Sequence, residues 1–391
     1  MSAPRPDTGN YYPWLQALAD RSPRSLSFLS RDWPEPEQWR IRARAKVQEL
    51  LSYDTEAADP EPEILETESR PGFARHRVRY RVTPERHTEA YLLIPDGLGG
   101  PAPAVMALHD HGGFYYYGKE KLTAWDGAPR LLRDFVGEAY QGRPYADELA
   151  RRGFVVLCPD AFYFGSQRLD PRQVAEYFTG PFPGLDAADP DEAIAAFNRF
   201  AQAHEHVLAK YLFAAGTTWP GVLFQGDRAS LSYLLTRPEV DPQRIGSMGL
   251  SIGGYRSAHL FALDPRVRVG VVAGWMPSYP RQMLDRFRHH TWMVYIPRLL
   301  EYLDVPDVAS LGAPNPLLVL NCAQDGLYPM ESMRAAEETI AAVYGRLGAG
   351  ARFRCRYYDV PHSLTVVMQE DACAWLEAWL APAAAAKPER R

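Results

Sequence analysis

No run of apolar residues in this 391-residue chain approaches the roughly 20 that a membrane-spanning helix needs. Residues 1–14 contain prolines and Asp7 but no apolar stretch, which argues against a secretory signal. The chain also has no excess of basic over acidic residues. The chain has 43 Lys and Arg against 48 Asp and Glu and a net charge of −5, whereas nucleic-acid binding calls for clustered positive charge. We therefore expect a cytoplasmic protein that binds neither a membrane nor a nucleic acid.

Cysteine is scarce, and the four cysteines lie far apart in the chain. Cys158, Cys322 and Cys355 fall in or beside strand-like runs, and Cys373 falls in a helix-like one. No pair has the Cys-x-x-Cys spacing of a redox or metal motif. We expect reduced thiols in the core of a cytoplasmic protein, with a structural disulfide as the less favoured alternative.

The composition is otherwise that of a globular protein, 46% apolar and 23% charged, which excludes wholesale disorder. Two segments of alternating polarity, 73–82 and 90–95, predict an antiparallel pair at a sheet edge. Short, solidly apolar runs follow, and such runs are typical of strands buried on both faces of a parallel sheet. They are 104–108, 154–158, 245–250, 267–273 and 317–320, with a mixed run at 352–360.

Helix-like segments separate the apolar runs, at 145–152, 227–236, 252–263, 330–347 and 365–380. This alternation predicts an α/β fold with a mostly parallel, doubly wound sheet. Two long gaps, 161–225 and 276–312, interrupt it. Both gaps leave the carboxyl ends of predicted strands, where α/β sheets bind their ligands, so we expect them to be lids.

The strongest chemical signal is the sequence Gly-Leu-Ser-Ile-Gly-Gly at 249–254. It directly follows a predicted strand and directly precedes a predicted helix. In that context Gly-x-Ser-x-Gly is typical of a nucleophile elbow, a sharp turn that exposes the serine side chain. The pattern therefore indicates Ser251 as a nucleophile, and a simple tight turn is the alternative.

A serine nucleophile needs a base, and the base needs a carboxylate to orient it. His362 follows the last predicted strand, and Asp325 follows the run 317–320, so both should lie at the same sheet edge as Ser251. The order Ser…Asp…His along the chain is the one that α/β hydrolases require. Asp304 and Asp307 are weaker candidates for the acid, because they lie in the insertion 276–312.

Stabilising an oxyanion requires two hydrogen-bond donors. The backbone N–H of Ile252 is the expected first donor. The second should come from the loop His-Asp-His-Gly-Gly at 109–113, most simply the N–H of His111, with Gly112 and Gly113 as alternates. The His-x-His pattern alone could indicate a metal, but no third ligand accompanies it. We expect no metal and no organic cofactor.

Together these motifs resemble the α/β-hydrolase superfamily, and more narrowly the serine hydrolases similar to dienelactone hydrolase and acetyl xylan esterase. The segments 239–254 and 154–160 carry the resemblance, which covers about 73–380. It implies an α/β-hydrolase fold and a Ser251–His362–Asp325 triad. One departure matters, since dienelactone hydrolases use a cysteine nucleophile where this chain has Ser251.

The resemblance divides the chain into an N-terminal helical segment with its connection, 1–70, and an α/β-hydrolase domain, 71–391. Residues 24–52 are expected to form two helices, separated at Pro34 and Pro36. The N-terminal segment could pack on the domain or on a second copy of the chain. The sequence leaves both options open, so a homo-oligomer remains an option.

Aromatic clusters follow three predicted strand ends, and we expect them to form a closed, largely apolar substrate pocket. The expected pocket residues are Phe114, Tyr115, Tyr116, Tyr117, Phe162, Tyr163, Trp275 and Met276. Asp160 is expected to brace its loop. Arg168, Lys119 and Lys121 are candidates for contacts with an anionic substrate.

The sequence thus predicts a serine hydrolase that cleaves small or medium, largely apolar or acetylated carboxylic esters through an acyl-enzyme. A peptidase or amidase, or an acyltransferase, could use the same triad. A non-catalytic binding module is less favoured, because all three triad residues are present. The expected partner is a small-molecule ester.

Overall fold

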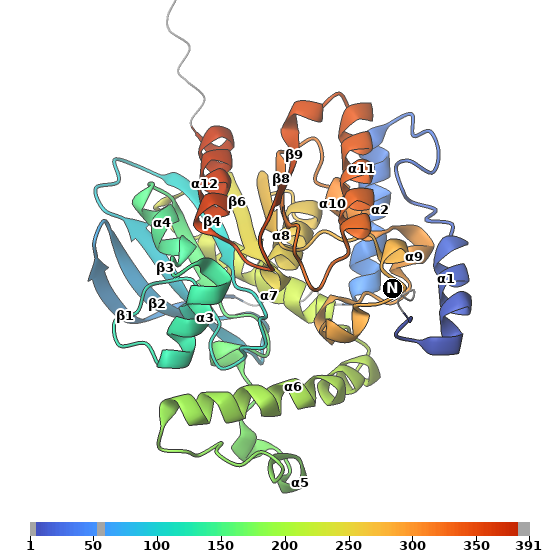
Figure 1. The fold of residues 1–391 in the computed structure, drawn as a ribbon. Helices are drawn as coiled ribbons and strands as arrows, with labels where there is room; N and C mark the ends of the chain where they lie inside the picture. Colours follow the sequence, from blue (N-terminus) through green and yellow to red (C-terminus); the bar gives the residue numbers. More distant parts are fainter. Residues whose placement is uncertain (1–4, 53–58, 382–391) are drawn as a thin grey trace, which may run out of the picture.

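The computed structural model describes residues 5–52 and 59–381, and in this part of the chain nine strands form one sheet (Figure 1). The strands are β1 (Glu63–Arg70), β2 (Phe73–Arg81), β3 (His87–Pro95), β4 (Ala102–Leu108), β5 (Val155–Pro159), β6 (Val240–Leu250), β7 (Val269–Ala273), β8 (Leu317–Cys322) and β9 (Phe353–Tyr358). Their order across the sheet is β1-β2-β3-β5-β4-β6-β7-β8-β9. The first three strands and β5 pair antiparallel, and the six strands from β5 to β9 pair parallel.

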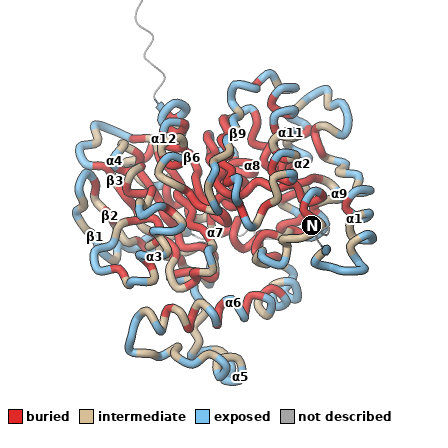
Figure 2. Tube along the Cα trace, viewed as in Figure 1, coloured by how far each residue is buried: buried red, intermediate tan, exposed pale blue. Residues whose placement is uncertain are grey.

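Helices cover both faces of the sheet (Figure 1). They are α1 (Tyr12–Asp20), α2 (Pro36–Leu51), α3 (Arg130–Tyr140), α4 (Tyr145–Arg151), α5 (Glu176–Thr179), α6 (Pro190–Ala214), α7 (Trp219–Leu234), α8 (Ile252–Leu263), α9 (Leu299–Tyr302), α10 (Val305–Ser310), α11 (Met330–Arg346) and α12 (Val366–Leu380). Apolar side chains of α2, α7, α8, α10 and α11 pack against one face, and those of α4 and α12 against the other. Figure 2 shows the resulting buried centre, which the parallel strands fill.

The register of the parallel strands brings several strand ends to one edge of the sheet. Leu108 at the end of β4 pairs with Gly249, and Leu250 at the end of β6 pairs with Ala273. Ala273 in turn pairs with Leu320 of β8. The residues that follow these strands are therefore neighbours, although they are far apart in the sequence.

The predicted α/β-hydrolase fold is confirmed, and the structure differs from the prediction in several local elements. Residues 24–35 form turns, so the expectation of two helices in 24–52 was wrong; α2 begins only at Pro36, which can start a helix but not continue one. The strand β1 was not predicted, because most of its residues are exposed and charged and give no apolar pattern. It places the start of the sheet at Glu63, inside the segment 1–70. The insertion 161–225 contains the 25-residue helix α6.

The cysteines of the structure are free thiols. Cys158, Cys322 and Cys373 are buried and Cys355 is partly buried. Burial raises the pKa of Cys322 to about 11 and the pKa of Cys373 to about 12, so these thiols stay protonated and unreactive at neutral pH.

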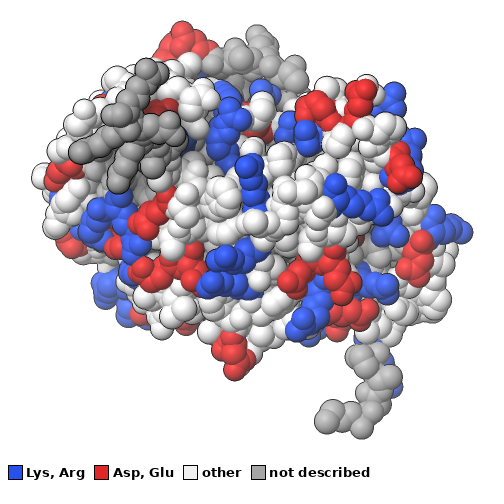
Figure 3. Space-filling view, turned by 90° about the horizontal axis from the view of Figure 1, so that it is seen from above, with Lys and Arg blue, Asp and Glu red and all other residues white. Residues whose placement is uncertain are grey.

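The surface carries mixed charge. On the face seen in Figure 3, basic and acidic side chains alternate and neither sign forms a continuous patch. Within residues 5–52 and 59–381, no helix is both long and apolar enough to cross a membrane.

The N-terminal segment packs on the same chain through α2. Trp39 and Val47 are fully buried in the core that α2 shares with α7 and α8. Arg44 reaches across to two further elements, donating from Nε to the carbonyl of Ala262 at 2.7 Å and from Nη2 to the carbonyl of Leu311 at 2.9 Å. One side chain therefore ties α2 to the ends of α8 and α10.

Replacing Arg44 should loosen this attachment. We expect Arg44→Ala to lower the free energy of unfolding by about 1–3 kcal/mol, because two buried carbonyls lose their donors. Arg42→Ala, an exposed position on the same helix, should change it by less than about 0.5 kcal/mol. Urea unfolding of both variants measures the difference, and equal stabilities would show that Arg44 does not anchor α2.

Candidate active site

Ser251 occupies a strained turn between β6 and α8. Its backbone has φ 58° and ψ −121°, a conformation that side-chain-bearing residues rarely adopt. The turn is possible because glycines line its inner side. A Cβ on Gly253 would lie 2.0 Å from the carbonyl oxygen of Leu108, and one on Gly249 would lie 2.4 Å from the carbonyl carbon of Gly253. Helix α8 can therefore approach β4 at backbone distance, with Ser251 at its N-terminus.

His362 and Asp325 form a hydrogen-bonded pair at the same edge. The distance from Nδ1 of His362 to Oδ2 of Asp325 is 2.7 Å. The second carboxylate oxygen of Asp325 accepts the backbone N–H of Leu327 at 2.7 Å. Both oxygens are thus engaged, which holds the carboxylate in one orientation and makes Nδ1 the protonated nitrogen of the neutral ring.

Ser251 and His362 lie on either side of one peptide unit at the end of β7. The N–H of Ser251 donates to the carbonyl of Ala273 at 2.8 Å. The ring of His362 covers the next residue, Gly274, where a Cβ would lie 3.2 Å from Cε1. Nε2 of His362 is buried and has no hydrogen-bond partner among the described residues. This nitrogen is therefore available to a hydroxyl group at the elbow.

The alternative acids, Asp304 and Asp307, have structural partners of their own. Together they form the capping box of α10. Asp304 also accepts the hydroxyl of Ser278 at 2.6 Å, and Asp307 accepts that of Ser27 at 2.6 Å. The structure pairs neither of them with His362.

The loop after β4 places its two histidines differently. His109 is fully buried, and its Nε2 accepts the N–H of Ala161 at 3.0 Å. Burial lowers the pKa of His109 well below its usual value, so the ring is neutral. Nδ1 of His111 accepts the N–H of Gly113 at 3.0 Å, so that donor is used within the loop. His111 and Gly112 then remain as sources of the second oxyanion N–H beside Ile252.

Helix α6, which lies in the insertion 161–225, braces this loop through a polar stripe. Asp191, Asn198 and Glu205 are spaced by seven residues and therefore share one helix face. Asp191 accepts the N–H of Leu131 at 2.9 Å. Asn198 accepts the N–H groups of Tyr115 and Tyr116 through Oδ1, at 2.9 and 3.0 Å.

Glu205 is the most connected residue of the stripe. Its Oε1 accepts from Nε2 of His111 at 2.8 Å and from the hydroxyl of Tyr115 at 2.6 Å, and its Oε2 accepts from the hydroxyl of Thr291 at 2.8 Å. Burial alone would raise its pKa, but the hydrogen bond from His111 and the other donors outweigh burial and lower the pKa of Glu205. One carboxylate thus joins both insertions to the loop after β4.

The second insertion braces the loop that carries Asp325. Arg286 donates to the carbonyl of Asp325 at 3.2 Å and to that of Gly326 at 2.6 Å. His290 lies 3.0 Å from the carbonyl of Leu327, and its ring packs edge-on against Tyr328 with 4.9 Å between ring centroids. No local pattern in the sequence marks these residues, because their partners are more than 30 positions away.

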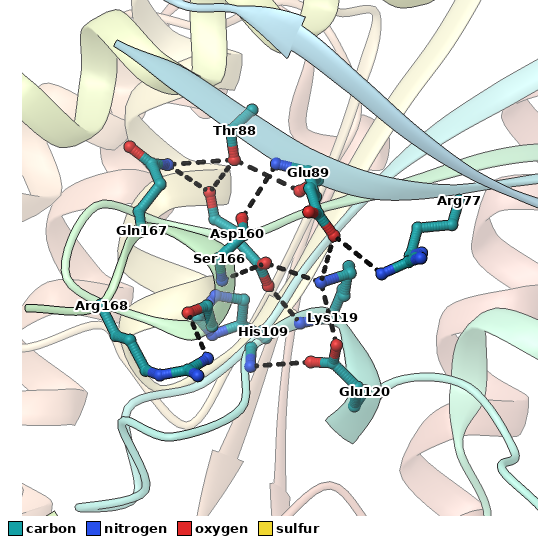
Figure 4. Close-up of polar contacts among 12 residues, drawn as sticks. Arg77, Thr88, Glu89, His109, Lys119, Glu120, Asp160, Ser166, Gln167 and Arg168 are labelled. Atoms are coloured by element: carbon teal, nitrogen blue, oxygen red, sulfur yellow. Dashed lines mark hydrogen bonds and ion pairs between the residues drawn. The ribbon is translucent and has the colours of Figure 1, made fainter. Parts of the chain in front are cut away.

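Two of the basic residues named as candidates for contacts with an anionic substrate, Lys119 and Lys121, have buried side chains that are held by groups of the protein itself. Figure 4 shows Lys119 held between the carboxylates of Asp160, Glu120 and Glu89. Burial alone would lower the pKa of Lys119, but these carboxylates raise it. Lys121 is fully buried and donates to the carbonyls of the loop after β4, and burial lowers its pKa to about 8.

The role expected for Asp160 fits its contacts. Its carboxylate accepts the backbone N–H groups of Lys119 and Ser166, both at 2.8 Å, which braces the loop after β5.

The residues expected to line the pocket fall into three groups. Trp275 and Met276 are buried where β7 ends beside Ser251, and Trp275 packs edge-on against Tyr255 of α8. The second group is buried and acts in packing, and it comprises Phe114, Tyr115 and Tyr163. The third group is only half-buried, and it comprises Tyr116, Tyr117 and Phe162.

The strand order, with helices on both faces and a serine turn after the central strand β6, defines an α/β hydrolase. Solved structures share this fold. A protein of Bacteroides fragilis NCTC 9343 that bears the name of an acetyl xylan esterase matches with a TM-score of 0.67 and 18% identity, covering 90% of this chain and 84% of that one. A glucuronoyl esterase from Solibacter usitatus matches with a TM-score of 0.60 and 14% identity, covering 91% and 97%.

Residues 131–342 match the model of the dienelactone hydrolase family. The chain belongs to this family and is a carboxylic ester hydrolase. A relative of Bacillus subtilis (strain 168) that carries the hydrolase name YtaP is 28% identical over 295 residues, which cover 74% of this chain and 83% of the relative.

Removing Glu205 should destabilise the fold. We expect Glu205→Ala to lower the free energy of unfolding by about 1–3 kcal/mol, because the buried hydroxyl of Tyr115 and the part-buried donors of His111 and Thr291 lose their acceptor. Glu205→Gln should lower the free energy of unfolding by less than Glu205→Ala does.

The pKa of Glu205 is lowered in the fold. The difference in the free energy of unfolding between wild type and Glu205→Gln should therefore be full above the pKa of an unfolded glutamate, and it should decrease as the pH falls below that pKa.

Thermal and urea unfolding at two pH values measure these differences. Gln202→Ala, an exposed position on the same helix, serves as the control and should change stability by less than about 0.5 kcal/mol. A Glu205→Ala variant as stable as this control would contradict the bracing role.

Proposed function

We propose that this protein hydrolyses carboxylic esters through an acyl-enzyme formed on Ser251. The observation that carries the proposal is the pair His362–Asp325, joined at 2.7 Å, with Nε2 of the histidine unpartnered beside the strained serine turn. Nδ1 bears the proton shared with Asp325, so Nε2 is the basic nitrogen.

The reaction proceeds in two halves. His362 takes the proton of Ser251 as its oxygen attacks the ester carbonyl, and then gives this proton to the departing alcohol. Water then attacks the acyl-enzyme with His362 again as base, the bond between the acyl carbon and the oxygen of Ser251 breaks, and His362 returns the proton to Ser251 as the carboxylic acid leaves. Asp325 holds the ring in place and stabilises its positive charge during both transfers.

The negative oxygen of each tetrahedral intermediate needs donors that are already in position. Ile252 is the first residue of α8, where a backbone N–H has no acceptor within the helix. The second donor is the N–H of His111, whose ring Glu205 holds in place. The positive end of the α8 dipole favours the same charge.

The acyl group we propose is small or of medium size. Trp275 and Met276 are buried where β7 ends, so bulky side chains border this side of the elbow, which favours short acyl chains. The two structural neighbours named above bear the names of an acetyl xylan esterase and a glucuronoyl esterase, so acetyl esters are the first substrates to test. The proposed reaction needs no metal, because the ring nitrogens of His109 and His111 are already engaged by the protein.

Ser251→Ala should fold normally and lose about 10⁴–10⁶-fold in kcat, because the nucleophile is gone. A fluorophosphonate probe should label wild type at Ser251 and fail to label the variant. Ser232→Ala, an exposed serine on α7, should retain full activity and labelling. Labelling at another serine, or an active alanine variant, would refute the mechanism.

The other two members of the triad should also be essential. We expect His362→Ala to reduce kcat by several orders of magnitude and Asp325→Asn by about 10⁴-fold, because the amide favours the wrong tautomer of the histidine. Asp307→Asn tests the rejected alternative and should leave kcat unchanged, since its partners are Ser27 and the cap of α10. A large loss in Asp307→Asn with an active Asp325→Asn would reverse the assignment.

A panel of p-nitrophenyl esters of rising acyl length tests the choice of bond. Short esters should be cleaved best, and peptide p-nitroanilides should be cleaved negligibly, because an amide needs a proton donor placed at its poor leaving group. EDTA should not change the rates. Peptide cleavage as fast as ester cleavage would indicate a peptidase, and transfer of the acyl group to an added alcohol in place of water would indicate an acyltransferase.

A further inference from the structure

A polar cleft of about 600 Å³ lies on the flank of the sheet, between the strands β1–β3 and the segment 116–126. Its floor is the turn after β5, at Gly165 and Ser166. Ser251 is not among the residues that line it. Figure 4 shows part of this cleft, with Arg77, Glu89, Lys119 and Glu120 facing one another.

The first wall is one face of the antiparallel strands, and it is a ladder of charged pairs. Glu66 of β1 stands opposite Arg77 of β2, which stands opposite Tyr91 of β3. Glu68 stands opposite Arg75 in the neighbouring rung, and the two form an ion pair. Directly opposite residues point to the same side of a sheet, so these side chains share one face.

The second wall is aromatic. Tyr116, Tyr117 and Trp125 line it, with Tyr116 and Tyr117 edge-to-face at 5.0 Å and Tyr117 and Trp125 edge-to-face at 5.7 Å. Trp125 is 41% exposed, so part of its ring faces solvent. Arg75 fixes the spacing of the walls, because it donates across the cleft to Thr123 Oγ1 at 3.0 Å and to the carbonyl of Ala124 at 2.6 Å.

Three of the four cations that line the cleft form ion pairs with its carboxylates, and the fourth, Arg168, donates to the carbonyl of Gly165 at 3.1 Å and lies over the ring of Tyr116. Five carboxylates and four cations line it, so an anionic ligand would meet no positive surplus. A hydroxyl group, in contrast, can accept from an arginine and donate to the adjacent carboxylate without breaking their ion pair. The exposed faces of Trp125 and Tyr117 suit the C–H face of a sugar ring, which is apolar and flat.

We propose that this cleft binds a neutral oligosaccharide, with its hydroxyl groups on the Glu66–Arg77 and Glu68–Arg75 pairs and one ring stacked on Trp125. The cleft is preorganised, since ion pairs and the Arg75 bridge hold both walls without a ligand.

The proposal extends to the proposed catalytic site, and this second step rests on the proposed function. The segment that begins as the oxyanion loop at His109 continues directly into the aromatic wall at Tyr116. Strands β3 and β6 are separated by β5 and β4, so Tyr91 and the elbow lie about three strand spacings, roughly 14 Å, apart across the sheet. A short oligosaccharide that bears an ester on one sugar can therefore occupy the cleft while its acyl group reaches Ser251.

Calorimetric titration of the Ser251→Ala protein tests binding without turnover. Xylohexaose and maltohexaose are the neutral probes, and an oligogalacturonate of similar length is the anionic one. We expect at least one neutral probe to bind, and Trp125→Ala and Glu66→Gln, each added to Ser251→Ala, to weaken this binding about tenfold. Trp14→Ala, an exposed tryptophan on α1, is the matched control and should bind as the parent does. No binding of either neutral probe, stronger binding of oligogalacturonate, or full binding after Trp125→Ala would overturn the proposal.

Kinetics separate this proposal from the proposed function. Trp125→Ala should raise the KM for acetylated xylohexaose about tenfold more than it raises the KM for p-nitrophenyl acetate. The ratio of the kcat values for the two substrates should change little. If wild type cleaves p-nitrophenyl acetate and the variant shifts both KM values equally, the coupling of the cleft to the site is wrong. If neither ester is cleaved by wild type, the proposed function fails, and the titration still decides whether the cleft binds sugars.

Discussion

The close approach of α8 to β4 at the turn around Ser251 is the contact on which the rest of the site depends. The carbonyl of Leu108 lies where a side chain on Gly253 would be, so helix and strand meet at their backbones. This approach places the N-terminus of α8 beside the loop 109–113 and forces Ser251 to a positive φ. The strain is sustained because β6 is paired on both sides, with β4 and β7, and cannot relax.

The two insertions act as braces for the loops at this edge. Helix α6 holds the loop after β4 through Asn198 and Glu205, and the segment around Arg286 and His290 holds the loop of Asp325. Thr291 joins the two systems, because its hydroxyl donates to Glu205. The loops that carry the proposed oxyanion donor and the acid are thus connected through one buried carboxylate.

The aromatic residues near the site divide between packing and surface. Those nearest Ser251, such as Trp275, are buried, whereas Tyr117 and Trp125 face a cleft whose other wall is charged. The expectation of a pocket lined mainly by apolar rings describes only the first group. Taken together, the two proposals describe a site with a small apolar acyl end and a polar flank, which suits an ester between a short acid and a hydroxyl-rich alcohol.

The sequence by itself determined the elements whose signals are local. Apolar runs marked the parallel strands, the glycines of 249–254 marked the turn, and the order of Ser251, Asp325 and His362 marked the class of hydrolase. It could not show β1, because an edge strand whose residues are mostly exposed has no apolar pattern. It also could not show the bracing role of α6, because the partners of Asp191, Asn198 and Glu205 lie in distant segments.

Only the tertiary structure decided which charged residues are internal. Lys119 and Lys121 are indistinguishable from surface lysines in the sequence, and the fold buries them against Asp160 and Asp110. The physical reason is the range of the interactions. Periodicity and turn chemistry act between near neighbours, whereas buried ion pairs and bridging carboxylates such as Glu205 join residues that become neighbours only when the chain has folded.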